Sequence, residues 1–364
     1  MDISVKKEDI VSALSITLGV VENRHTLPIL ANVLFEVDEN TFKLTATDLE
    51  SFVTTSGPLT NTQSSGITTT SAKKLNELCR LIPDGEDIRI FLEGEKLNIR
   101  TKNGKYSLSI LPSADFPIFD IDSGGAPLVI PAQDLRTLIT DTSFAIGPAG
   151  WKRQLEGVFL SVDGGQIVAA TSDGARLAVA KISTTSNNSF SGIIPKKPIN
   201  EMAKILSDQQ GDAELKIYNA SLELVVGNLI FKSKLIDANF PDYQRVIPSG
   251  ESSLLEINVK DFSETLSRVS VLSSEKSRRI NLAISSDGII ISTDSLNQGE
   301  AEEFFPAKYT GEELEIVFNG TYLQEIMSHL KTDLCHINFF GPDKSCIITP
   351  PDSDSPTYLI NPLL

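Results

Sequence analysis

The sequence contains few of the residues on which disulfide, metal and nucleophilic chemistry depends. Three cysteines, three histidines and one tryptophan occur among its 364 residues. An odd number of cysteines without a repeated spacing argues against a disulfide framework and indicates a reducing compartment. No Cys-x-x-Cys pair occurs, and no Cys/His spacing is typical of zinc ligands. The composition therefore predicts neither a metal nor a cofactor.

Long apolar runs are also absent. No segment approaches the roughly 18 consecutive apolar residues of a membrane-spanning helix. Residues 1–14, MDISVKKEDIVSAL, carry acidic side chains and lack the apolar core of a signal peptide. We therefore expect a soluble cytoplasmic protein that has no membrane partner.

Motifs typical of enzymes are scarce. Neither a Walker loop nor a Gly-x-Gly-x-x-Gly fingerprint occurs. Ser123 lies in an Asp-Ser-Gly-Gly string similar to loops that carry protease nucleophiles or catalytic aspartates, but a glycine-rich linker explains the string better. A catalytic triad is recognised by its geometry, and few histidines are available to serve as a base. The sequence therefore favours a protein that is not an enzyme, with a hydrolase as the less favoured alternative.

A threefold repeat is the strongest positive signal. An apolar-x-apolar strand leads into a predicted helix that opens at Asp9, Asp134 and Asp261, which lie 125 and 127 residues apart. The flanking apolar residues recur as Ile3, Val5, Ile10 and Leu14; Leu128, Ile130, Leu135 and Ile139; Leu255, Ile257, Phe262 and Leu266. A second helical stretch recurs at residues 73–82, 197–206 and 322–331. Coincidence explains so many matches poorly, so we infer three copies of one domain.

Two acidic residues recur with the same offset. Asp48 and Asp173 each follow the end of a predicted strand. Aspartate carboxylates at such positions commonly accept hydrogen bonds from backbone amides a little further along the chain. We therefore expect both residues to cap turns rather than to act in catalysis.

The repeat divides the chain into three domains, residues 1–125, 126–253 and 254–364. The junctions are DSGGAP at 122–127 and PSGESS at 248–253, where glycine and proline interrupt helix and strand. Each domain has an ordinary domain size and is predicted to be α+β, with two helices on one face of a largely antiparallel sheet of about eight short strands. The opposite faces of the helices would meet solvent or a ligand.

Acidic residues outnumber basic ones, 48 to 32, and the net charge of −16 argues against a protein coated in nucleic acid. The basic residues nevertheless recur on equivalent helices. The second helices carry Lys73, Lys74 and Arg80; Lys196, Lys197 and Lys204; His329 and Lys331. The first helices carry or adjoin Lys6, Lys7, Arg136, Lys260 and Arg268. Solvated helix faces explain any single pair, but the recurrence predicts an electropositive surface within an acidic body.

Four strings, taken together, resemble the family of bacterial replicative sliding clamps, the beta subunits of DNA polymerase III. These strings are NRHTLPIL at 23–30, LTATDLE at 44–50, TSDGARLAVA at 171–180 and FPDYQRVIP at 240–248. The resemblance spans the whole chain in order. It implies a ring of two three-domain subunits joined head to tail, with six similar domains around duplex DNA, helices lining the hole and sheets forming the outer wall.

The resemblance also implies the partners. A ring that contacts phosphates reads no sequence and can slide on any double-stranded DNA. The expected protein partners are a second copy of the chain, the catalytic subunit of DNA polymerase III, the clamp loader and other proteins that carry a clamp-binding linear motif. The chain would be a processivity factor that tethers these proteins to DNA.

Three groups of site residues follow from the resemblance. The DNA-facing residues would be Arg24, Lys73, Lys74 and Lys197, with Lys152 and Arg153, beside Trp151, as further candidates. A peptide-docking cleft between the second and third domains would comprise Leu155, Ser172, Gly174, Arg176, Leu177, Pro241, Arg245, Val246, Asn319, Tyr322, Cys346, Leu359 and Pro362. The dimer interface would set Val271 and Leu272 against Leu78, Ile82, Tyr106 and Leu108 of the other copy.

The predicted cleft has apolar walls and a few polar groups, which suits an extended peptide anchored by leucine or phenylalanine. Core packing is the competing explanation for Leu155, Leu177 and Val246. The chain also departs from the family here, since Ala175 stands where histidine is common and Asn361 where methionine is usual, and the ending NPLL lacks the usual Arg-Leu. A polar Asn361 would weaken apolar anchoring or select a different partner side chain. A clamp paralogue that binds proteins without encircling DNA stays open as an alternative.

Overall fold

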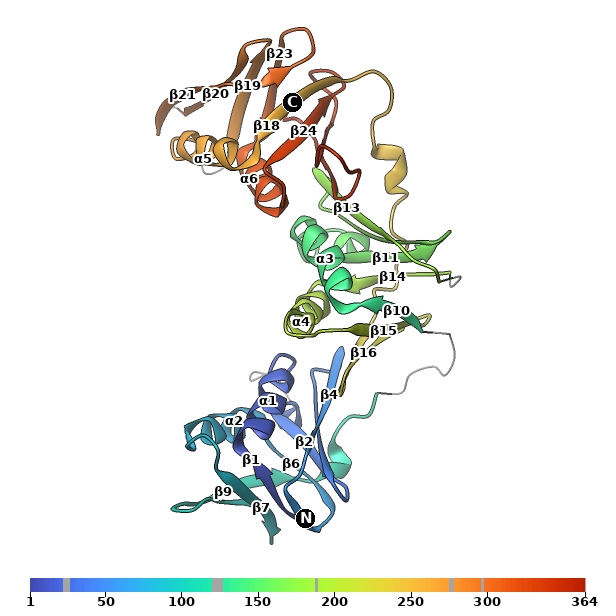
Figure 1. The fold of residues 1–364 in the computed structure, drawn as a ribbon, viewed down its shortest axis with the longest axis vertical. Helices are drawn as coiled ribbons and strands as arrows, with labels where there is room; N and C mark the ends of the chain where they lie inside the picture. Colours follow the sequence, from blue (N-terminus) through green and yellow to red (C-terminus); the bar gives the residue numbers. More distant parts are fainter. Residues whose placement is uncertain (22–26, 120–126, 187–188, 275–277, 296–297, 364) are drawn as a thin grey trace. The chain divides into compact units, whose positions relative to one another are not determined.

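The computed structural model describes all residues except 22–26, 120–126, 187–188, 275–277, 296–297 and 364. Figure 1 shows helices and antiparallel strands following one another along the chain. The described residues form two compact units. Unit 1 comprises residues 1–135 and 200–235, and unit 2 comprises residues 136–199 and 236–364.

Unit 1 contains one antiparallel sheet of 13 strands. Its strands are β1 (Asp2–Lys6), β2 (Asn32–Val37), β3 (Thr41–Thr47), β4 (Ser51–Pro58), β5 (Asn61–Ser64), β6 (Gly66–Ser71), β7 (Asp87–Glu93), β8 (Lys96–Arg100), β9 (Lys105–Leu111), β10 (Leu128–Pro131), β15 (Asp212–Ile217), β16 (Ser221–Val226) and β17 (Leu229–Lys234). The order is β10-β15-β16-β17-β4-β3-β2-β6-β9-β8-β7-β1-β5. The pairing of β17 with β4 therefore joins strands from the predicted second and first domains.

Unit 2 contains sheets of nine and four strands. The larger is ordered β14 (Phe190–Pro195), β11 (Gly157–Asp163), β12 (Gln166–Ser172), β13 (Arg176–Ser183), β26 (Thr357–Ile360), β25 (Cys346–Thr349), β24 (Leu334–Phe339), β18 (Ser253–Asn258) and β22 (Lys308–Tyr309). The smaller is ordered β21 (Gly299–Phe305), β20 (Gly288–Ser295), β19 (Arg279–Ser285) and β23 (Leu314–Asn319). The antiparallel pair β13–β26 brings the end of the chain beside the predicted second domain.

The described residues include six α-helices, two for each repeat. These are α1 (Lys7–Thr17), α2 (Ala72–Leu81), α3 (Ala132–Thr142), α4 (Lys196–Ser207), α5 (Val259–Ser270) and α6 (Gly320–His329). Helix α1 packs with α2, and α5 packs with α6. Each pair buries its apolar face in a core that also contains strand residues, such as Leu75 with Phe35 and Phe262 with Phe318. The predicted α+β class and the threefold repeat of helix pairs on antiparallel sheets are confirmed.

The first helices begin two residues earlier than the sequence predicts. Lys7, Ala132 and Val259 are their first residues, so Asp9, Asp134 and Asp261 lie in the first turn and do not open the helix. In α5 the N-cap residue is Asn258, whose side chain accepts a hydrogen bond from the Asp261 amide. A carboxylate within the first turn is still favourable because the amino end of a helix carries partial positive charge.

The two repeated aspartates cap turns, as the sequence predicts. Asp48 Oδ1 accepts hydrogen bonds from the amides of Glu50 at 3.0 Å and Ser51 at 2.6 Å. Asp173 Oδ1 accepts hydrogen bonds from the amides of Ala175 and Arg176, both at 3.0 Å. Each carboxylate thus satisfies backbone donors that would otherwise be unpaired between consecutive strands.

Two further sequence predictions concern membrane-spanning helices and the domain junctions. Among the described residues, no helix combines the length and apolar character needed to cross a membrane. Residues 248–252 form neither helix nor strand, and residues 122–126 of the first junction lie outside the described residues. The exact domain boundaries therefore stay predictions.

Candidate functional site

Unit 2 contains a cavity of about 290 Å³ beside the β13–β26 pair. Its lining includes many of the predicted cleft residues, namely Leu155, Ser172, Gly174, Arg176, Leu177, Pro241, Val246 and Leu359. It also includes Lys152, Phe240, Asp242, Tyr243 and Asn361. The structure therefore brings together residues that are separated in the sequence by more than 200 positions.

The floor of the cavity is apolar because of the register of its strands. Leu177 on β13 lies directly opposite Leu359 on β26. These two side chains are 3% exposed and pack in one cluster with Ala170 and Val179. Aromatic residues extend this cluster, since the rings of Phe159 and Phe240 stack with centroids 5.0 Å apart. The side chains at the floor of the cavity are therefore apolar and closely packed.

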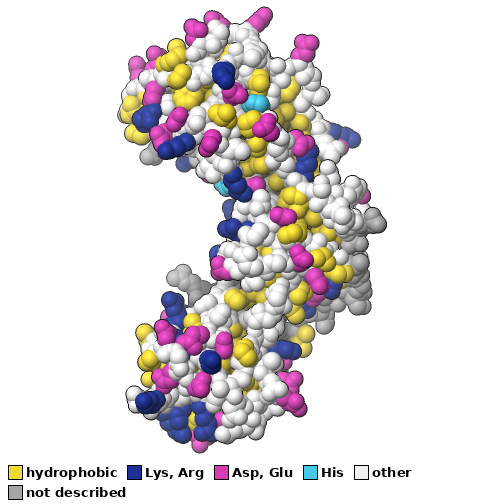
Figure 2. Space-filling model, viewed as in Figure 1, with side chains coloured by type: hydrophobic (Ala, Val, Ile, Leu, Met, Phe, Trp, Pro, Cys, Tyr) yellow, Lys and Arg dark blue, Asp and Glu magenta, His cyan; other side chains and the backbone are white. Residues whose placement is uncertain are grey.

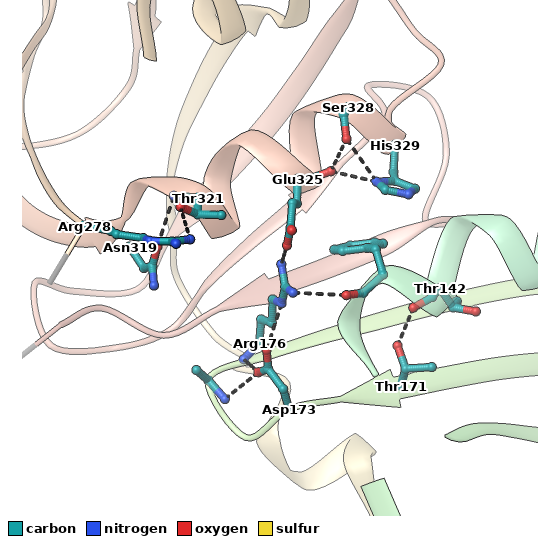
Figure 3. Close-up of polar contacts among 12 residues, drawn as sticks. Thr142, Thr171, Asp173, Arg176, Arg278, Asn319, Thr321, Glu325, Ser328 and His329 are labelled. Atoms are coloured by element: carbon teal, nitrogen blue, oxygen red, sulfur yellow. Dashed lines mark hydrogen bonds and ion pairs between the residues drawn. The ribbon is translucent and has the colours of Figure 1, made fainter. Parts of the chain in front are cut away.

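Arg176 fixes the polar end of the cavity. Its side chain is 7% exposed, and its guanidinium donates to Asp173 Oδ2 at 3.0 Å, to the carbonyl of Phe144 at 3.0 Å and to Glu325 of α6 (Figure 3). The same group lies 4.1 Å from the ring centroid of Tyr322. Burial and the Asp173 carboxylate raise the pKa of the Tyr322 hydroxyl, so it stays protonated at neutral pH. Arg176 thus ties the β12–β13 turn to α6.

Replacing Arg176 with alanine is expected to lower the free energy of unfolding of unit 2 by about 3 kcal/mol, because Asp173 would be left as an unpaired, largely buried carboxylate. Urea unfolding followed by circular dichroism measures this change. Arg245 provides a matched control, since its side chain is 84% exposed and pairs with Asp242. Arg245→Ala should change the stability by less than about 1 kcal/mol. Equal effects of the two substitutions would contradict the assigned role of Arg176.

The remaining predicted cleft residues do not line the cavity. Arg245 forms an exposed ion pair with Asp242, and Asn319 caps α6 by accepting a hydrogen bond from the Thr321 amide at 3.0 Å. The ring of Tyr322 packs against the guanidinium of Arg176. Cys346 is buried opposite Ile360 on the neighbouring strand, and Pro362 is half-buried.

Phe240, Asp242 and Tyr243 line the cavity but were not among the predicted cleft residues. They lie in or just before the short helical turn η5 (Tyr243–Val246). The signal that could have found them is the FPDYQRVIP string, whose aromatic residues interrupt an otherwise polar and proline-containing segment.

The predicted DNA-facing residues lie on exposed surfaces where the structure describes them. Lys73 and Lys74 are exposed in the first turn of α2, and Lys197 is exposed in the first turn of α4. Lys152 and Arg153 are exposed at the short turn η4 (Arg153–Leu155). Arg24 lies outside the described residues. Figure 2 shows basic and acidic side chains interspersed on the visible face of the molecule.

Several other basic residues of the repeated helices have carboxylate partners. Lys7 pairs with Asp84, Lys204 with Glu201, Arg268 with Glu303 and Lys331 with Asp141. Their charge is therefore partly neutralised within the protein. The electropositive character of the helices is weaker than a count of lysine and arginine along the sequence suggests, and it depends more on residues such as Lys74.

The predicted interface residues differ in their accessibility. Val271, at the end of α5, is 73% exposed, and Tyr106 on β9 is 41% exposed. Leu78, Leu108 and Leu272 are half-buried, whereas Ile82 is only 6% exposed and packs in the core of unit 1. The neighbouring Leu81, which the sequence did not single out, is 85% exposed.

Nothing in the described residues assembles a catalytic centre around the thiols. Burial raises the pKa of Cys79 and of Cys335 to about 12, and it raises the pKa of Cys346 further. All three thiols therefore stay protonated at neutral pH and are poor nucleophiles. No group of three or more metal-ligating side chains occurs among the described residues. Ser123 lies outside them.

Comparison with known proteins gives one consistent result. The models of the DNA polymerase III beta subunit match residues 1–120 as the N-terminal domain, 129–242 as the central domain and 244–364 as the C-terminal domain. The beta sliding clamps of Pseudomonas aeruginosa and Escherichia coli are 33% and 32% identical, with each alignment covering 100% of both chains. The solved P. aeruginosa subunit superposes with a TM-score of 0.97 at 33% identity over 100% of both chains. The Caulobacter crescentus subunit gives 0.94 at 28% identity, also over 100% of both.

Proposed function

The chain belongs to the DNA polymerase III beta subunit family, the beta sliding clamps, and from this premise we propose that two copies close head to tail around duplex DNA. Like the rest of the family, it is a non-catalytic processivity factor that serves DNA polymerase III on DNA. We also propose which residues contact the DNA, the partner proteins and the second copy. A cytoplasmic location stays a prediction.

The observation that best supports a tethering function is the cavity beside the β13–β26 pair. It combines an apolar floor with polar groups that are held in place by Arg176 and Asp173. Extended peptides with one or two apolar anchors fit such sites, because the anchors supply affinity and the polar groups fix the register. We propose that it receives linear motifs from the polymerase catalytic subunit, the clamp loader and other DNA-processing proteins.

Exposed lysines at the starts of α2 and α4 support contact with DNA. Lys73, Lys74 and Lys197 place ammonium groups on equivalent helices of the first two repeats. Ammonium–phosphate contacts carry no sequence information, so they permit movement along the duplex. Retention would then come from topological linkage rather than from high affinity, and the acidic excess of the chain would discourage DNA from binding elsewhere.

Replacing Lys73, Lys74 and Lys197 together with glutamate is expected to impair retention on nicked circular DNA without unfolding the protein. The reason is that like charge would then oppose the phosphates. The salt dependence of DNA binding should also weaken, by about one unit of logarithmic slope for each ammonium–phosphate pair that the substitutions remove. Gel filtration of loaded circles measures retention at several salt concentrations.

Lys43, Lys96 and Lys344 form a matched control, because they are exposed and lie outside the helices. Their replacement by glutamate changes the net charge equally and should leave retention unaltered. Unchanged retention in the helix variant would remove those three lysines from the DNA-facing surface.

Two strand edges support a head-to-tail dimer. Strand β21 is the outermost strand of its sheet, and β9 pairs with β6 only through Ile110 and Leu111, which leaves residues 105–109 with a single described neighbour, β8. The first edge carries Glu300 and Glu302, and the second carries Lys105. Open edges of opposite charge suit strand addition between copies. Exposed Tyr106 lies on β9, and exposed Val271 adjoins Leu272, whose Cδ1 lies 4.0 Å from a Cβ atom added to Gly299 on β21. Both side chains would supply apolar contact.

A clamp paralogue that binds proteins without encircling DNA is the competing function. Loading onto nicked circular DNA by a clamp loader with ATP distinguishes the two. A protein that binds partner peptides but is never loaded would fit the paralogue and contradict the ring.

A further inference from the structure

We propose that Trp151 is a specificity-determining contact of the cavity, and that a docked peptide lays an aromatic side chain against the exposed part of its indole. The inference rests on the proposed function of the cavity as a peptide-docking site. Trp151 is the only tryptophan in the chain and is 51% exposed. It stands at the rim, between Lys152 and Gly174 in space, and both of these residues line the cavity.

The indole packs directly on the backbone of Gly174. A Cβ atom added to Gly174 would lie 2.7 Å from Cη2 and 3.2 Å from Cζ3 of Trp151. Gly174 also has a φ of +88°, a conformation that side chains other than glycine rarely adopt. Only glycine therefore fits beneath the indole, and the six-membered ring of Trp151 contacts a residue that lines the cavity.

The side chain of Lys152 also contacts the indole of Trp151. The ammonium nitrogen of Lys152 lies 4.4 Å from the centroid of the Trp151 ring. Such an approach to the face of an indole is attractive because the ring face carries negative charge. The edge on Gly174 and the cation on one face together restrict the ring, while half of its surface stays accessible to a ligand.

The turn beneath the indole is fixed from its other side by Asn361. The backbone amide of Asn361 donates to the carbonyl of Ala175 at 2.9 Å, and its side-chain amide donates to the carbonyl of Gly174 at 3.3 Å. The hydroxyl of Ser345 donates to Asn361 Oδ1 at 2.6 Å. The turn at Gly174 and Ala175 is thus held between Trp151 and Asn361, so the rim is formed before a ligand arrives. Preformed surfaces lose less entropy on binding.

An aromatic side chain suits this rim best. The exposed indole offers a flat surface next to an apolar cavity, and aromatic rings gain additional attraction from stacked or edge-on contact with one another. Tryptophan is also enriched among the residues that dominate binding energy at protein interfaces. The inferred ligand is an extended peptide that places an apolar side chain in the cavity and an adjacent aromatic side chain against Trp151.

The single tryptophan makes the contact directly measurable. The probes are a synthetic nine-residue peptide with adjacent leucine and phenylalanine residues and a matched peptide in which leucine replaces the phenylalanine. The first peptide should change the intrinsic tryptophan fluorescence in a saturable manner. By calorimetry, Trp151→Ala should weaken the first peptide about 10-fold, the size of one aromatic contact, and the second peptide by less than about 2-fold. Trp151→Phe, which keeps a flat ring, should restore most of the affinity.

Ile118, which is 87% exposed and lies in unit 1, provides the control. Ile118→Ala should bind both peptides as the wild type does, and thermal unfolding checks that the Trp151 variants fold. If the wild type binds neither peptide, both the docking function and this inference fail. If Leu177→Lys abolishes binding but Trp151→Ala binds the first peptide as tightly as the wild type, the inference alone is overturned.

Discussion

Replacing Leu177 with lysine is expected to abolish binding of a polymerase tail peptide, with a decrease of at least about 100-fold in affinity. Leu177 is 3% exposed and forms the floor of the cavity with Ala170, Val179 and Leu359. A lysine there would place an ammonium group where the peptide anchor must sit, and taking that charge out of water costs several kcal/mol. Calorimetry with the C-terminal peptide of the polymerase catalytic subunit measures the decrease, and the dimer should persist in sedimentation.

A second variant separates loss of the cleft from loss of the fold. Val246 also lines the cavity but is 56% exposed, so Val246→Glu adds a charge at the wall without burying it in the sheet. Val129, on β10 in unit 1, is 55% exposed and serves as the matched control. Val129→Glu should bind the peptide normally. Undiminished binding by both cavity variants would show that the peptide docks elsewhere.

Replacing Val271 and Leu272 with aspartate is expected to convert a dimer into monomers at micromolar concentration. Val271 is 73% exposed at the end of α5, so its apolar side chain is accessible to a second copy. Two carboxylates in the contact would lose their hydration without gaining partners, and they would lie near the acidic strand β21. Equilibrium sedimentation measures the dissociation constant, which should rise at least about 100-fold.

Val129→Asp is the control for this experiment, because it adds a carboxylate at an exposed valine on β10, and seven strands lie between β10 and β9 in the order of the unit 1 sheet. It should sediment as the wild type does. A wild-type chain that sediments only as a monomer at micromolar concentration would refute the dimer itself.

Much of the fold could be predicted from the sequence because the same apolar pattern of strands and helices occurs three times. The apolar periodicity that places Leu75 and Phe262 in their cores also sets the positions of the helices. The capping roles of Asp48 and Asp173 follow from short-range geometry, which a sequence carries locally. The starts of the first helices were placed two residues late, because the cap depends on backbone geometry as well as on residue type.

The site was less predictable because its properties depend on tertiary contacts. Whether Leu81 or Ile82 faces solvent depends on where α2 ends, and Leu81 is its last residue. Whether Lys204 or Lys331 is neutralised depends on Glu201 and Asp141, and Asp141 lies far from Lys331 in the sequence.

The contact of Trp151 with Gly174 is a further example. The sequence places these residues 23 positions apart with no shared motif. Family resemblance predicted the floor of the cavity, whereas the positions of the aromatic residues Phe240 and Tyr243 and of Trp151 depend on tertiary contacts.

The most direct test of a ring compares the lifetime of the protein on circular DNA with its lifetime on the same DNA after linearisation. The chain is loaded onto a nicked circular duplex by a clamp loader with ATP, and the circle is then cut once with a restriction enzyme. Topological linkage predicts that the protein stays on the circle through gel filtration and leaves within minutes of linearisation, and that the Val271 and Leu272 aspartate variant is never retained. Equal lifetimes on circular and linear DNA would contradict encirclement.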